Sequence, residues 1–336
     1  MKRVILVALI ASLVLSLNVM EVAAFDKSSD IKVAWIGKTL NNPWWVHAYD
    51  LARAEAAKLG IDLISYLPEE EVDLEKQISM IEAAIQQNVH AIVISASSGE
   101  GVIPALKKAN EAGITVINFD TAVADQSLVK AFICTDNETQ AYRAGKYMCE
   151  KLGGKGEVAL LEGLLTQSTG VERKAGFMKA CAEYPEIKVV ATAPAEWRSD
   201  LAMDATVNML TAHPNIKGIF ASNDQMAVGM VNGVYAVGKD PKDMILIGFD
   251  GILDAVELLD NGELSAFIAV PTLELGEMPV RLAVASVIHP EYEYERIMYG
   301  HASLVTRSFE EGFSDESLAE YAARVFPLRG VNKKGY

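Results

Sequence analysis

Cysteine and histidine are scarce in this sequence, which has three cysteines and five histidines among 336 residues. The histidines show no spacing typical of metal ligands, so we predict no metal site. An odd number of cysteines leaves at least one thiol unpaired, which argues against a scaffold built on disulfides. The residues concerned are His47, His90, His213, His289, His301, Cys134, Cys149 and Cys181.

Motifs of common catalytic sites are also missing. The sequence contains neither the G-x-S-x-G turn of a serine hydrolase nor the glycine-rich loop of a nucleotide phosphate site. The segment Gly153–Gly156 is rich in glycine but precedes a predicted strand, the wrong side for phosphate at a helix N-terminus. We therefore predict no cofactor and no enzymatic activity, and keep an exported hydrolase as the weakest alternative.

Positive charge is in deficit, with a formal net charge of −15. Such a surface repels nucleic acid and anionic lipid, so neither is a predicted partner. Hydrophobic residues make up 51% and charged residues 22% of the chain, proportions typical of a globular protein.

The only long apolar run lies at the N-terminus. Lys2 and Arg3 precede an uncharged run, Val4 to Leu17, which is followed by the small-residue site Val22-Ala23-Ala24. This layout predicts a secretory signal peptide over residues 1–24, cleaved after Ala24. A membrane anchor is the alternative, but the run is short for a bilayer span.

Short β-branched runs alternate with helical patterns along the rest of the chain. Strands are predicted at Ile31–Ile36, Ile61–Tyr66, Ala91–Ser95 and Ile114–Phe119, and the same alternation restarts after Val129–Cys134. Strands that are apolar throughout predict parallel sheets covered by helices on both faces. We predict two doubly wound α/β lobes, with a single (β/α)₈ barrel as the alternative.

The loop after the first strand has features of a ligand site. Asn42 is a favoured helix cap, and Pro43 suits the first turn of a helix. Trp44 and Trp45 are neighbours on a helix, so they cannot both face one core and at least one is free to line a cleft. In open α/β sheets, ligands bind beyond the carboxyl ends of the strands, where this loop lies.

Polar residues follow other predicted strands at the same relative position. Asp120, Asn223, Asp224 and Asp250 stand at such strand ends in both halves of the chain. Each one is also explained by helix capping or a turn, but capping explains the repeated pattern less well. Carboxylates and amides hydrogen-bond hydroxyl groups, and an indole ring packs on the carbon-bound hydrogens of a sugar. The pattern predicts a site for a polyhydroxylated ligand.

Several motifs together resemble bacterial periplasmic sugar-binding proteins of the ribose-binding type. The similarity runs from Ile31 to about Thr306 and rests on these segments: Thr39-Leu40-Asn41-Asn42-Pro43, Asn118-Phe119-Asp120, Glu172-Arg173 with Gly176-Phe177, Leu210-Thr211-Ala212-His213-Pro214, Phe220-Ala221-Ser222-Asn223-Asp224 and Ile247-Gly248-Phe249-Asp250-Gly251. The resemblance implies two lobes joined by three hinge strands (the type I periplasmic binding fold). It implies that Leu264–Val270 crosses between the lobes. The predicted N-terminal lobe is 25–133 plus 271–301, and the C-terminal lobe is 134–270 plus 302–336.

The resemblance also implies nine ligand-binding positions, with Trp44 and Trp197 as aromatic walls from opposite lobes. These positions are Lys38, Asn42, Trp44, Trp45, Asp120, Arg173, Trp197, Asn223 and Asp250. Three residues depart from ribose binders: Lys38 replaces a small hydroxyl residue, Thr121 an arginine, and Val270 a glutamine. Ribose itself is therefore not the expected ligand, because a site built for one hydroxyl pattern rejects others. Lys38 either neutralises Asp120 or meets a ligand carboxylate.

The resulting prediction is a periplasmic, monomeric solute-binding protein that captures a small sugar or polyol and delivers it to the membrane subunits of an ABC importer. The alternative is a receptor for an acidic sugar or a furanose-type signalling molecule that acts in chemotaxis or quorum sensing. A chemoreceptor is compatible as a further partner. An effector-binding regulator core is less favoured, because the chain has a predicted signal peptide and no N-terminal helix-turn-helix.

Overall fold

The computed structural model describes residues 30–71 and 73–325. The predicted signal peptide, 1–24, lies outside these residues. The first half of the described chain contains the following helices and strands: β1 (Lys32–Ile36), α2 (Pro43–Leu59), β2 (Asp62–Tyr66), α3 (Leu74–Gln86), β3 (Ala91–Ile94), α4 (Ile103–Glu111), β4 (Thr115–Phe119), β5 (Ala131–Cys134), α5 (Asn137–Lys151), β6 (Lys155–Glu162) and α6 (Ser168–Ala182).

The second half continues the alternation and ends with short strands and a helix. Its elements are β7 (Glu186–Pro194), α7 (Ser199–Ala212), β8 (Ile216–Ala221), α8 (Asp224–Ala236), β9 (Ile245–Asp250), α9 (Leu253–Asp260), β10 (Ala266–Ala269), α10 (Thr272–Ile288), β11 (Ile297–Tyr299), β12 (Ser303–Thr306), β13 (Glu316–Ser317) and α11 (Leu318–Val325).

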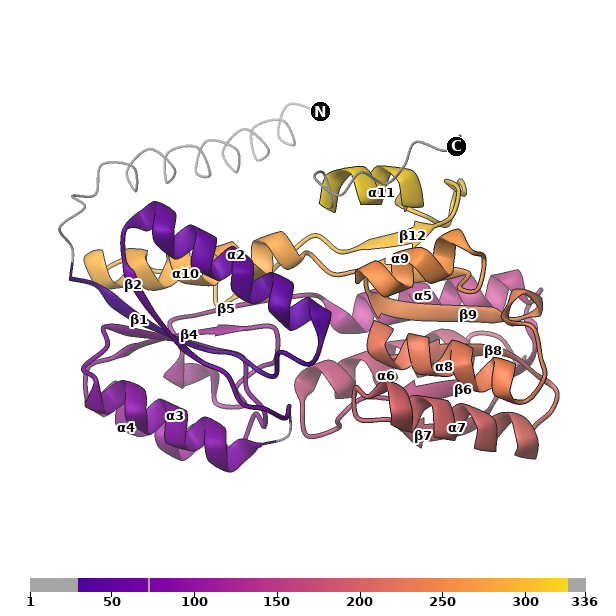
Figure 1. The fold of residues 1–336 in the computed structure, drawn as a ribbon, viewed down its shortest axis with the longest axis horizontal. Helices are drawn as coiled ribbons and strands as arrows, with labels where there is room; N and C mark the ends of the chain where they lie inside the picture. The colour runs from indigo at the N-terminus through magenta and orange to yellow at the C-terminus, as the bar shows by residue number, and fades with distance from the viewer. Residues whose placement is uncertain (1–29, 72, 326–336) are drawn as a thin grey trace.

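Two separate sheets form the centres of two lobes (Figure 1). The first sheet has the strand order β11-β5-β4-β3-β1-β2, and its strands are all parallel. The second has the order β13-β12-β10-β9-β8-β6-β7, in which only the β10–β12 pair is antiparallel. Two open sheets rule out the barrel alternative and confirm the predicted doubly wound α/β class.

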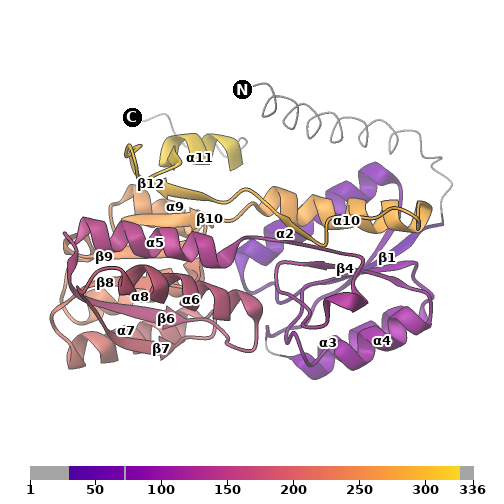
Figure 2. The same cartoon turned by 180° about the vertical axis from the view of Figure 1, so that it is seen from behind.

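The chain passes three times between the lobes. It leaves the first sheet after β5, returns after β10 and crosses again between β11 and β12. Figure 1 therefore shows the late helix α10 packed beside the early helix α2, on one face of the first sheet. Figure 2, from behind, shows α3 and α4 together on the opposite face.

These crossings agree with the predicted role of Leu264–Val270, since the chain returns to the first lobe directly after β10. We propose the lobe bounds given above, 25–133 with 271–301 and 134–270 with 302–336, as the division of the mature chain. The parts at 25–29 and 326–336 lie outside the described residues.

Apolar strands account for both cores. Every residue of β3, β5 and β10 is buried, as the continuous apolar runs in the sequence predicted. The three cysteines are buried and unbridged, and the Sγ atoms of Cys149 and Cys181 lie 3.9 Å apart across the α5–α6 contact. In the tail, α11 begins at Leu318, directly after Glu316 and Ser317 pair with β12.

Candidate functional site

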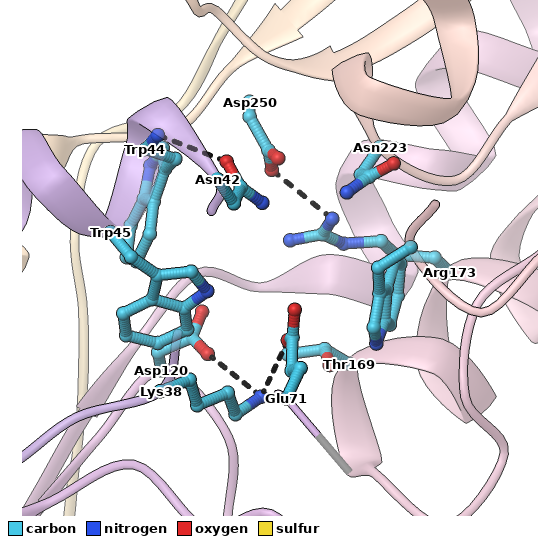
Figure 3. A pocket seen from close by; sticks show the side chains of 11 residues that line it. Lys38, Asn42, Trp44, Trp45, Glu71, Asp120, Thr169, Arg173, Asn223 and Asp250 are labelled. Carbon is cyan, nitrogen blue, oxygen red and sulfur yellow. Dashed lines mark hydrogen bonds and ion pairs between the residues drawn. The ribbon is translucent and has the colours of Figure 1, made fainter. Parts of the chain in front are cut away.

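One cavity opens between the lobes, at the carboxyl ends of strands from both sheets (Figure 3). Its lining residues come from both lobes and are Lys38, Asn42, Trp44, Trp45, Glu71, Asp120, Thr169, Arg173, Trp197, Asn223 and Asp250. The structure thus brings together all nine residues predicted from the sequence. It also adds Glu71 and Thr169.

Two asparagines in the cavity act as helix caps. Asn42 Oδ1 accepts a hydrogen bond from the backbone N–H of Trp44 at 3.0 Å, and Asn223 Oδ1 accepts one from Met226 at 2.9 Å. Because the oxygens serve α2 and α8, the amide nitrogens remain as donors, and Figure 3 shows both nitrogens facing the cavity. Capping and ligand contact are therefore compatible in the same side chain.

Trp44 and Trp45 form one wall of the cavity. Their rings meet edge to face, with centroids 4.7 Å apart, and both side chains are buried. Trp45 also packs against Phe119 of the core. Trp44 Nε1 is buried and has no hydrogen-bond partner among the described residues. An unpaired buried N–H is costly, so this atom marks a position where a ligand oxygen would be stabilised.

Trp197 comes from the second lobe, in the loop after β7. Its backbone φ is +65°, a left-handed conformation that is unusual for a residue with a side chain. A Cβ placed on Gly163 would lie 2.0 Å from the ring, so only glycine leaves room for this indole. Backbone strain of this kind persists where surrounding packing imposes it, and it is common at ligand sites.

The two strand-end aspartates share the same unusual backbone. Asp120 has φ +57° and Asp250 has φ +129°, and each directs a carboxylate toward the cavity. Asp120 Oδ2 accepts hydrogen bonds from Thr121 Oγ1 at 2.8 Å and from Ser95 Oγ at 3.2 Å. Burial raises the pKa of Asp250 well above its ordinary value, although the nearby Arg173 acts in the opposite direction.

Arg173 is buried within the second lobe. Its Nε donates to Asn137 Oδ1 at 2.9 Å, and its Nη1 donates to Ser222 O at 2.8 Å and to Asp250 Oδ1 at 3.2 Å. The guanidinium stacks 3.8 Å from the centroid of Phe249. Figure 3 shows it pointing into the centre of the cavity, where Nη2 is available to a hydroxyl oxygen.

Lys38 is almost fully buried in the first lobe, with 1% of its surface exposed. Its Nζ donates to Thr121 Oγ1 and to Gln167 Oε1, both at 2.8 Å, and lies 3.3 Å from Glu71 Oε1. The distance from Nζ to Asp120 Oδ2 is longer, 3.9 Å. An ammonium group has three N–H donors, and these partners account for all of them.

Residues 30–71 and 73–325 contain neither a candidate membrane span nor a candidate metal-binding cluster. Within these ranges, no helix has the length and apolar character needed to cross a bilayer. Across the same residues, histidine, cysteine, aspartate and glutamate side chains form no group of three or more suited to a metal ion.

Comparisons with known proteins agree with this geometry. Residues 33–289 match the periplasmic binding protein domain. The D-allose-binding periplasmic protein of Escherichia coli K12 is 31% identical over 254 residues, covering 74% of this chain and 81% of that protein. The ribose import binding protein RbsB of Bacillus subtilis 168 is 32% identical over 290 residues, or 84% of this chain and 92% of the relative. The chain belongs to the periplasmic binding protein family.

Solved structures show the same fold with sugars bound. An ABC transporter solute-binding protein from Actinobacillus succinogenes 130z, in complex with D-allose, aligns with a TM-score of 0.75 and 32% identity. The alignment covers 82% of this chain and 97% of that structure. A protein from Burkholderia graminis, in complex with D-arabinose, aligns with a TM-score of 0.79 and 27% identity over 84% and 97% of the two chains. The predicted family and fold class are confirmed.

Two of the three departures from ribose binders, Lys38 and Thr121, contact each other in this periplasmic binding protein. Lys38 and Thr121 are bonded directly, so the hydroxyl of Thr121 occupies one donor of the added ammonium group. Val270, the third departure, is buried and does not line the cavity. The replaced arginine and glutamine therefore leave fewer polar groups around the ligand position than the ribose-type pattern implies.

Sequence reasoning missed Glu71 and Thr169. Glu71 ends a run of three glutamates after β2, which looks like an ordinary solvated loop, and Thr169 lies in the first turn of α6. Burial raises the pKa of Glu71, against the influence of the Lys38 ammonium. Neither position carries a local sequence signal, because neither stands at a predicted strand end or in a recognised motif.

Proposed function

We propose that this protein is an exported receptor that captures one small neutral sugar or polyol between its lobes and delivers it to an ABC importer. The observation that supports this most is the convergence of polar and aromatic side chains from both lobes on one buried cavity. A ligand that contacts both lobes favours the closed form over the open form, and thereby holds the protein closed.

The charge of the cavity favours a neutral ligand over an acidic one. Glu71, Asp120 and Asp250 face the cavity, and the ammonium of Lys38 is already surrounded by protein oxygens. A ligand carboxylate would have to displace one of these oxygens and approach other buried carboxylates. Hydroxyl groups can instead donate to Asp120 and Asp250 and accept from Asn42, Asn223 and Arg173.

The wider cellular role follows from family membership and the sequence. We infer cleavage after Ala24, release into the periplasm and action as a monomer without catalytic turnover. Docking to a chemoreceptor stays a prediction from the resemblance. Mass spectrometry of a sugar recovered unchanged after prolonged incubation would support pure binding, whereas a converted product would contradict it.

A thermal-shift and calorimetry screen tests the proposal. The mature protein is titrated with D-allose, D-ribose, D-arabinose, D-fucose and myo-inositol, and with D-galacturonate and D-gluconate. We expect at least one neutral compound to raise the melting temperature by several degrees, and the acids to have no effect. Stabilisation by an acid alone would reverse the choice of ligand charge. Stabilisation by none of these compounds would remove the receptor proposal.

Two substitutions link any stabilisation to this cavity. Trp197→Ala and Asp250→Ala should abolish the shift while the ligand-free protein still folds. Matched controls are Tyr235→Ala and Asp204→Ala, which change exposed residues of α8 and α7 outside the cavity. A full shift in both cavity variants would place the ligand elsewhere.

A further inference from the structure

The edge of the cavity contains a side chain that bridges the lobes without lining the cavity itself. Gln167 precedes α6 and is 1% exposed. Its Oε1 accepts from Lys38 Nζ at 2.8 Å and from Trp197 Nε1 at 3.0 Å, and its Nε2 donates to Ser97 O at 3.3 Å. A single amide thus joins two groups of the first lobe to an indole of the second.

This arrangement exists only when the lobes are closed. Lys38 follows β1 and Ser97 follows β3, both in the first sheet, whereas Gln167 and Trp197 follow β6 and β7 in the second. Opening the cleft must break the bonds to Lys38 and Ser97, while the bond to Trp197 lies within one lobe. In the closed form the amide is buried, so each of these bonds forms away from competing water.

The same amide oxygen touches the predicted ligand wall. Trp197 has a strained backbone, and its ring packs directly against Gly163 while its N–H donates to Gln167. The oxygen that fixes this N–H is also the oxygen that receives the Lys38 ammonium. Moving Lys38 therefore affects Trp197 through a shared acceptor, Gln167 Oε1.

We infer that Gln167 is a positioning residue that couples lobe closure to the placement of Trp197 against the sugar. The inference rests on the proposed function, because it assigns to closure a direct effect on the ligand wall. Gln167 acts through Trp197 and Lys38 and does not contact the ligand.

A neighbouring bond supplies the control. The backbone N–H of Ala122 donates to Ser168 Oγ at 2.9 Å, also across the lobes, but no hydrogen bond joins Ser168 to Trp197 in the described chain. Ser168→Ala removes one bond between the lobes and leaves the aromatic wall in place. Gln167→Leu removes the two bonds that Gln167 makes across the lobes and also releases the indole.

The kinetic test uses stopped-flow binding of the best binder among D-allose, D-ribose, D-arabinose and myo-inositol. For Gln167→Leu we expect the dissociation rate to rise about 30-fold, because the variant loses the charge-assisted bond from Lys38 and the neutral bond to Ser97. The association rate should change less than about threefold. Ser168→Ala should raise dissociation only about threefold to fivefold. Gln167→Glu keeps an acceptor for Lys38 and Trp197 and should recover much of the affinity.

A spectroscopic readout separates positioning from general loss of stability. The protein has four tryptophans, so its indole N–H groups give few NMR signals, and Trp197→Phe identifies one of them. With sugar bound, Gln167→Leu should shift the Trp197 indole signal and leave that of the core residue Trp35 in place. An unmoved Trp197 signal, or equal dissociation rates in Gln167→Leu and Ser168→Ala, would overturn the inference.

A measurement without sugar keeps this inference separate from the proposed function. Fluorescent labels on Glu111→Cys in α4 and Asp204→Cys in α7, both exposed positions on different lobes, report the closed population by energy transfer. Gln167→Leu should lower that population severalfold relative to the unsubstituted labelled protein. If no compound binds, the receptor proposal fails while this result still decides the role of Gln167, and an unchanged population refutes it.

Discussion

The two lobes present nearly the same set of side chains to the cavity, and they differ most in their cation. Each lobe supplies an asparagine that caps a helix, an indole wall, an aspartate with positive φ and one buried positive charge. The pairs are Asn42 with Asn223, Trp44 with Trp197, Asp120 with Asp250, and Lys38 with Arg173. Three pairs match in chemistry, whereas the cations differ in what they bind.

The cation of the first lobe is bound by the protein on every side. Lys38 contacts Thr121, Glu71 and Gln167. Its Nζ also lies over the ring of Trp45, 5.2 Å from the centroid. Arg173 donates from Nε to Asn137 and from Nη1 to Ser222 and Asp250, while its Nη2 faces the cavity. From this comparison we propose that Lys38 organises the closed protein and that Arg173 binds the ligand.

Removing the guanidinium should give the largest effect. Arg173→Met is expected to lower sugar affinity at least 100-fold, because it deletes a ligand contact and leaves Asp250 buried without its cation. Calorimetric titration measures the loss. Arg173→Lys, which keeps the charge but not the planar fork, should recover only part of the affinity. A full recovery would show that charge alone matters at this position.

Removing the ammonium should have a smaller effect on affinity. Lys38→Met leaves Glu71 and Asp120 without a cation and breaks the bond to Gln167, so we expect roughly a tenfold loss through faster dissociation. The same titration and stopped-flow measurements apply. If Lys38→Met weakened binding more than Arg173→Met, the two roles assigned above would have to be exchanged.

The smallest expected effect concerns pH. In the first lobe, Pro43 follows the capping asparagine, whereas in the second lobe Asp224 stands at that position. Burial raises the pKa of the Asp224 carboxyl to about 7. Between about pH 4 and pH 7 the folded protein holds a proton that the unfolded chain has lost. Acidification within this range should therefore increase the free energy of unfolding contributed by this group.

Urea denaturation at pH 5 and pH 7 measures this contribution. On acidification, Asp224→Asn should gain less stability than the unsubstituted protein. The control Asp254→Asn, which changes an exposed residue of α9, should gain as much as the unsubstituted protein. Asp250 and Glu71 also have raised pKa values and act in the same direction, so only the difference between variants is diagnostic. Identical pH responses in all three proteins would contradict a buried proton at Asp224.

The repeated strand ends made much of the site predictable from sequence. Asp120, Asn223 and Asp250 stand at the ends of apolar strands, which fixes both their place on the sheet and their direction. Trp197 has no such marker, because it lies in a loop with left-handed backbone, and only the family resemblance pointed to it. The resemblance also supplied the crossing after β10, which periodicity alone could not decide.

The partners of Lys38 were beyond the reach of sequence reasoning. Its choice between Asp120 and a ligand carboxylate was left open, whereas the structure surrounds it with Thr121, Glu71 and Gln167. These residues come from separate loops and both lobes. Contacts between separate loops leave no periodicity or capping pattern in the chain, so sequence reasoning does not reveal them.

The last described helix has a consequence for how the protein can be shortened. Tyr321 of α11 donates from its hydroxyl to Gly251 O at 2.5 Å, directly behind the strained Asp250, and its ring packs on Phe267. Helix α11 thus supports the turn that orients the Asp250 carboxylate. Trimming before α11 would spare both sheets and every cavity residue, yet would free that turn to relax.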